Sequence, residues 1–119
     1  MNDDDDTRKI KIENEVREFC AILNIPVPEI IIRKSAWLGS VYYGNNLLVF
    51  DKSHILNRKW EYVRDTIRHE CIHMKLGPGK KHGREFRALC KLYGVVPRAS
   101  FSRKAVDHLT KPKTRRSRP

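Results

Sequence analysis

The residues best suited to chemistry lie in one short stretch, His69-Glu70-Cys71-Ile72-His73, which has the pattern HExxH. On a helix, residues four apart share a face, so His69 and His73 can direct two imidazole nitrogens at one metal ion. Glu70 is then placed to act as a general base on a water molecule at that metal. The composition predicts roughly 0.01 chance matches to this pattern. The stretch therefore indicates a zinc hydrolase site.

A third ligand is expected, because a catalytic zinc ion usually has three protein ligands and one position open to water. We predict that it is His82, since the turn Gly77-Pro78-Gly79 can fold the chain back toward the first two histidines. Phe86 follows one helical turn later, and burying its ring would aim His82 at the metal. Glu85 is the second-best candidate, and His108 is disfavoured because it lies in the basic tail region.

The first half of the chain has the pattern of a helix followed by a small sheet. Thr7 could cap the helix, and Pro26 and Pro28 are expected to end it. Residues 29–33, 37–43 and 47–51 are predicted strands of an antiparallel or mixed sheet, the last two joined by a hairpin turn. An exposed sheet edge would suit an extended peptide substrate. The helix carries one apolar stripe, formed by Ile12, Val16, Phe19, Cys20 and Leu23.

The second half of the chain is predicted to be helical. Ser53 is a plausible N-cap for a short turn, and His54 lies outside any ligand spacing, so a structural or surface role is expected. A helix over residues 59–76 carries HExxH, and a last helix runs over residues 82–93. Cys71 lies 100° or more around the helix axis from both histidines and is not expected to bind metal.

Length and composition limit the remaining possibilities. A chain of 119 residues suits one domain, and we predict an acidic disordered N-terminus at 1–6, the domain at 7–105 and a disordered basic tail at 106–119. The apolar runs are too short for a membrane span, and a secretory signal is not evident. Three scattered cysteines fit a reducing compartment, so a cytoplasmic, nuclear or nucleoid location is expected.

The formal net charge is +11, and much of it lies near the C-terminus. Between residues 98 and 119 there are eight Lys or Arg and a single acidic residue, Asp107. Such a segment can bind the phosphates of DNA, or it can be a solvated tail. Lys80 and Lys81, just before His82, would add positive charge at the rim of the site. The candidate DNA contacts are therefore Lys80, Lys81, Lys111, Lys113, Arg115, Arg116 and Arg118.

The order of the motifs resembles one family. The metzincin pattern HExxHxxGxxH fails, because Leu76 and Gly79 stand where it requires glycine and histidine. Instead, HExxH is followed after eight residues by His82-Gly83-x-x-Phe86, and later by Gly94-Val95-Val96-Pro97-Arg98. This arrangement resembles the SprT/Spartan-like zinc metallopeptidase family, and the resemblance covers about residues 7–105.

The resemblance implies a zincin-like α+β domain that cleaves proteins bound or crosslinked to DNA. It assigns His69, His73 and His82 as zinc ligands and Glu70 as the general base. Many members carry an additional zinc ribbon, and this chain has no cysteine after Cys90. Two alternatives stay open at this point. One is a basic nucleic-acid-binding module with a structural metal, closed by four ligands, and no protease activity. The other is an HExxH hydrolase with a small substrate.

Overall fold

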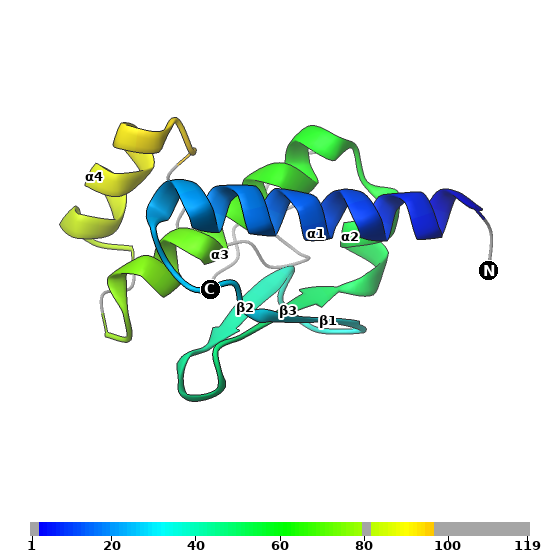
Figure 1. The fold of residues 1–119 in the computed structure, drawn as a ribbon, viewed down its shortest axis with the longest axis horizontal. Helices are drawn as coiled ribbons and strands as arrows, with labels where there is room; N and C mark the ends of the chain where they lie inside the picture. Colours follow the sequence, from blue (N-terminus) through cyan, green and yellow to red (C-terminus); the bar gives the residue numbers. More distant parts are fainter. Residues whose placement is uncertain (1–2, 80–81, 97–119) are drawn as a thin grey trace, which may run out of the picture.

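The computed structural model describes residues 3–79 and 82–96. The predicted contacts Lys80 and Lys81, the basic tail and His108 lie outside the described residues. The described chain is an α+β domain with a three-stranded sheet, as predicted (Figure 1). Its elements are α1 (Asp3–Leu23), β1 (Glu29–Arg33), β2 (Gly39–Tyr42), the 3₁₀ turn η1 (Tyr43–Asn45), β3 (Leu47–Asp51), α2 (Lys52–Asn57), α3 (Trp60–Leu76) and α4 (Arg84–Tyr93).

Helix α1 buries the predicted stripe, since all five of its apolar residues are at most 2% exposed. The predicted start after Thr7 is wrong, because the helix begins at Asp3. Asp5 and Asp6 lie in its first turn, where negative charge is favourable next to the unpaired backbone amides. The helix ends at Leu23, and the next residue, Asn24, adopts the left-handed conformation with φ 59°.

The side chain of Arg8 joins α1 to the segment between α2 and α3. Its Nη1 donates to the carbonyl oxygens of Ile55, at 3.2 Å, and Arg58, at 3.0 Å. The guanidinium also lies 5.7 Å from the centre of the Trp60 ring. One cation therefore satisfies two carbonyls at the end of α2 and positions α1 over the start of α3.

We expect Arg8→Ala to lower the free energy of unfolding by about 1–3 kcal/mol, because two carbonyls lose a charged donor. Chemical denaturation measures this change. Arg17→Ala is the matched control on the same helix, since Arg17 is exposed and its Nη1 donates to Asn14 one turn away. Its effect should stay within about 0.5 kcal/mol. Equal effects of the two substitutions would contradict the proposed anchoring by Arg8.

The sheet is mixed, with the strand order β1-β3-β2. Strand β3 pairs parallel with β1 and antiparallel with β2, so β2 is an edge strand. It is shorter than the predicted 37–43, because Tyr43 already belongs to the 3₁₀ turn. Asn46 closes that turn in the left-handed conformation, with φ 51°. Leu48 and Phe50 of β3 point into the hydrophobic core shared with the helices.

The N-cap of α2 is Asp51, and the prediction of Ser53 is wrong. The Asp51 carboxylate accepts a hydrogen bond from the backbone N–H of His54 at 3.1 Å and another from that of Ser35 at 2.9 Å. A buried carboxylate at the end of β3 makes both bonds, so it caps the helix and holds the preceding loop.

Helix α3 is the central element of the core. It packs against α1, and α4, which follows it in the sequence, lies near its C-terminal end (Figure 1). Gly77 ends the helix as predicted, with φ 89°. Helix α4 begins at Arg84, two residues after the predicted His82, because Gly83 is extended and serves as the N-cap. Within residues 3–79 and 82–96, no helix has the length and apolarity needed to cross a membrane.

Candidate metal centre

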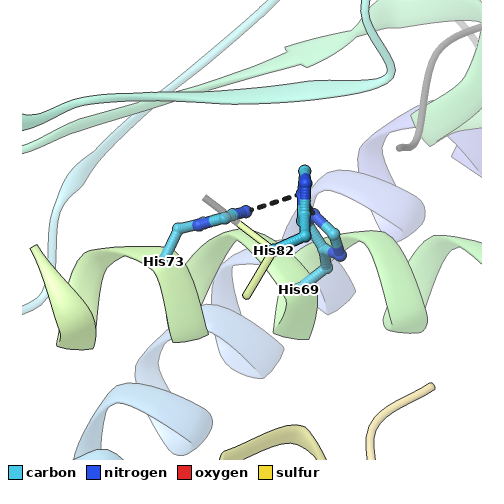
Figure 2. Close-up of side chains that lie close together, drawn as sticks. All are labelled: His69, His73 and His82. Carbon is cyan, nitrogen blue, oxygen red and sulfur yellow. Dashed lines mark hydrogen bonds between the residues drawn. The ribbon is translucent and has the colours of Figure 1, made fainter. Parts of the chain in front are cut away.

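The three predicted ligands meet in space. His69 and His73 come from successive turns of α3, and His82 comes from the turn before α4 (Figure 2). Nε2 of His82 lies 3.1 Å from Nε2 of His73 and 3.3 Å from Nε2 of His69. Their ligand atoms all lie within 4.8 Å of one another, and the group has no further member among the described residues.

These distances fit a metal ion. Zinc–nitrogen bonds of 2.0–2.1 Å in a tetrahedron place neighbouring ligand nitrogens about 3.3 Å apart. The observed separations of 3.1 and 3.3 Å match that edge length. Imidazole nitrogens bind zinc and also several other transition metals. The three side chains can therefore hold one metal ion and leave a fourth position open.

The aromatic ring of Phe86 packs against all three imidazole rings. Its ring is fully buried and lies 4.8, 4.5 and 5.0 Å from the ring centres of His69, His73 and His82. It stacks on His73 and meets the other two at steeper angles. The prediction that a buried Phe86 would aim His82 at the other histidines is consistent with this packing.

The imidazoles are suited to bind a cation at neutral pH. Burial, and then the neighbouring His82, lowers the pKa of His73 to about 4. Burial also lowers the pKa of His82. A metal ion binds the neutral form of imidazole, so these two ligands do not have to release a proton first.

Glu70 is the acidic group beside this cluster. Its side chain is 5% exposed, and burial raises its pKa to about 8. A metal ion at the three histidines would favour the ionised carboxylate and act against that shift. Burial and a bound metal ion would therefore act in opposite directions on the pKa of Glu70, the candidate group for accepting and returning a proton.

The metal-free protein is expected to lose stability as the pH rises from about 6.5 to 8. The folded state keeps the Glu70 proton up to a pKa of about 8, whereas the unfolded chain releases it near 4.5. The slope is at most about 1.4 kcal/mol per pH unit. His73 acts in the opposite direction between about pH 4 and 6.5, because there the unfolded chain binds more protons.

Denaturation of chelator-treated protein at pH 6.5, 7.2 and 8 measures this slope. Glu70→Gln is the control, because the amide does not titrate and should remove the decline over this window. An equal decline in the variant would show that another group is responsible.

Tyr43 contacts the backbone of one of the three ligand residues. Its hydroxyl donates to the carbonyl oxygen of His73 at 3.2 Å, so the hairpin after β2 is tied to the helix that carries the ligands. Burial, and then the negative charge of Glu70, raises the pKa of the Tyr43 phenol. This contact between Tyr43 and α3 was not predicted from the sequence. The position of Tyr43 beside a turn was the signal in the sequence.

Three further residues have the expected positions. Cys71 is a free, fully buried thiol in the hydrophobic core that also contains Cys20, and it does not belong to the group of converging ligands, as predicted. Glu85, the second-best candidate for the third ligand, is exposed on α4 and does not belong to the group of converging side chains. His54 is buried in the core, which agrees with a structural role.

Comparison with known proteins identifies the family. The model of the SprT-like family matches residues 14–106. The chain belongs to the SprT-like family. The resemblance noted from the motifs is therefore confirmed over most of the predicted domain. No curated protein matches the sequence significantly.

Solved structures of metallopeptidases share the fold of this SprT-like chain. The metallopeptidase zymogen of Methanocaldococcus jannaschii jannalysin is similar with a TM-score of 0.62 and 26% identity, over 83% of each chain. The zymogen of Pyrococcus abyssi abylysin has a TM-score of 0.59 and 22% identity, over 69% of this chain and 79% of its own. The zincin-like fold predicted from the sequence is confirmed.

Proposed function

We propose that this protein is a zinc-dependent endopeptidase, with His69, His73 and His82 as the metal ligands and Glu70 as the general base. The observation that carries the proposal is the convergence of three imidazole Nε2 atoms, at separations of 3.1 and 3.3 Å, beside a buried carboxylate. Membership of the SprT-like family supports the same chemistry.

The set of three ligands favours a catalytic over a structural metal. Structural zinc sites are normally closed by four protein ligands, whereas catalytic sites keep one position for water or substrate. No fourth ligand joins His69, His73 and His82 in the part of the chain that the structure describes. This supports the peptidase over a nucleic-acid-binding module with a closed metal site.

The chemistry is divided between the metal and Glu70. Zn²⁺, when bound, lowers the pKa of a coordinated water molecule and polarises the scissile carbonyl group. Glu70 accepts the proton of the attacking water on its carboxylate and passes it to the nitrogen of the departing amine. Burial favours the protonated form of Glu70, which is the form that the side chain takes between these two proton transfers.

Strand β2 is the proposed binding edge for the substrate main chain. It pairs with β3 on one side only, and it packs against α3, which carries HExxH. A peptide in extended conformation can add to such an edge through backbone hydrogen bonds. This mode demands little of the substrate sequence, which suits an enzyme that cleaves unrelated proteins.

We propose that the substrates are proteins on DNA, with DNA held by the basic residues outside the described part of the chain. The described residues carry fifteen Lys and Arg against thirteen Asp and Glu, so they are nearly neutral. The positive excess lies at Lys80, Lys81 and residues 97–119. Attraction to phosphates through these residues should weaken as salt increases.

Cleavage of histone and casein by the zinc-loaded full chain, with and without DNA, tests both parts of the proposal. We expect histone cleavage to increase with DNA at low salt, and this increase to fall when Arg115, Arg116 and Arg118 are all replaced by Ala. Equal cleavage with and without DNA would contradict the DNA-linked role but would be consistent with the proposed peptidase activity. No cleavage of either protein by zinc-loaded enzyme would contradict the peptidase itself.

A further inference from the structure

Gly39, the first residue of β2, lies directly against Glu70. A Cβ atom at position 39 would lie 2.8 Å from Cγ and 3.0 Å from Oε2 of Glu70. It would also lie 3.1 Å from Cγ2 of Thr66. Separations this short are below van der Waals contact, so any side chain at position 39 would have to displace its neighbours. The absence of a side chain is what allows β2 to approach the carboxylate.

The backbone at position 39 does not itself require glycine. Gly77, Gly79 and Gly94 have positive φ values, whereas Gly39 does not. It is paired in regular register with Phe50 of β3. Space at the carboxylate is therefore the physical reason for glycine here, and a close approach of this kind is a recognised role of glycine inside strands.

Thr66 limits the same small space from the side of the helix. Its hydroxyl donates to the carbonyl oxygen of Tyr62 at 3.1 Å and lies 2.8 Å from Nε2 of His54. With the hydroxyl proton used toward Tyr62, the ring of His54 supplies the proton for the second bond. Two bonds fix the orientation of the Thr66 side chain, and its methyl group is left facing position 39.

We propose that Gly39 is a positioning residue for Glu70: with Thr66, it confines the carboxylate beside the three histidines. This inference rests on the proposed peptidase function. Carboxylate and metal ligands come from adjacent positions on α3, but the direction of the long Glu70 side chain is not set by the helix. Strand β2 sets it by lying against Cγ and Oε2.

Gly39→Ala tests the role, and Gly44→Ala is the matched control. Gly44 lies in the same hairpin, and a Cβ there would meet nothing within 4 Å. In Gly39→Ala the atoms that must move belong to side chains, so we expect the fold and one zinc per chain to persist. We expect kcat to fall about 10²-fold with KM changed less than about threefold, because a misplaced base slows the chemical step alone. Gly44→Ala should stay within about twofold of the parent chain.

A crystal structure of Gly39→Ala provides a readout that does not need activity. The Glu70 carboxylate should have moved by about 1 Å or more, as a Cβ needs roughly that much additional room. An unmoved carboxylate, or an unchanged kcat, would overturn the inference. If the parent chain cleaves nothing, the proposed function fails. The position of Glu70 in the crystal structure of Gly39→Ala still decides whether Gly39 confines it.

Thr66→Ser is the second test of the inference, for the case in which Gly39→Ala does not fold. It keeps the hydroxyl that bonds to His54 and removes only the methyl group, so stability and zinc content should change little. A several-fold fall in kcat, again without a matching change in KM, supports confinement of Glu70 from this side. Unchanged kcat in Thr66→Ser, together with an unfolded Gly39→Ala, would mean that Gly39 serves the fold alone and would overturn the inference.

Discussion

Glu70→Gln is expected to reduce peptide hydrolysis by about 10²–10⁴-fold, the range that general acid–base catalysis contributes. Glutamine fills the same buried space as glutamate, but its amide does not accept the proton of the attacking water. Zinc should stay bound at one ion per chain, because the three histidines are unchanged. Steady-state cleavage of casein or histone, alongside metal analysis of the same samples, measures both quantities.

Glu61→Gln is the matched control for this experiment. Glu61 is an exposed carboxylate in the first turn of the same helix, so its loss should leave zinc content and cleavage within about twofold. Cleavage retained in Glu70→Gln would remove Glu70 from the role of general base. Zinc lost from Glu70→Gln would show instead that the carboxylate contributes to metal binding.

His82→Ala is expected to abolish stable zinc binding, and with it hydrolysis. The substitution leaves only two ligands, on successive turns of α3, and its effect should exceed the 10–100-fold loss of affinity that follows removal of a hydrogen-bond partner to a ligand. After dialysis against a weak chelator, we expect less than about 0.1 zinc per chain. Competition with a chromophoric chelator gives the change in affinity.

Glu85→Ala and His108→Ala are the controls for His82→Ala, because these residues are the other candidates for the third ligand. Glu85 is exposed on α4, away from the converging imidazoles. Each control should keep one zinc per chain. Zinc retained in His82→Ala and lost in Glu85→Ala would make Glu85 the third ligand.

Local periodicity was sufficient to predict the helices and their buried faces. The stripe of α1 from Ile12 to Leu23 is buried as expected, because one face of a helix is set by spacing along the chain. Helix ends were less accurate. Asp3, Asp51 and Gly83 all define ends that were placed elsewhere, since capping depends on which side chain reaches a free backbone amide.

Position 39 could have been identified from the sequence in part. A glycine inside a predicted strand indicates a bulge or a close approach of another group. What approaches it is Glu70, 31 residues further along the chain, and no local pattern specifies that contact. For the same reason, the sequence pattern did not predict the burial of His54 or its hydrogen bond to Thr66.

The sequence by itself determined the pair His69 and His73 and the acid between them, because a helix repeat places residues four apart on one face. The order of its motifs carried the resemblance to the SprT-like family. It also singled out His82 through the motif that follows HExxH. Only the tertiary structure decided that His82 meets the other two, through a turn and the packing of Phe86. It alone placed β2 against Glu70, since contacts between distant segments depend on how the sheet and α3 pack together.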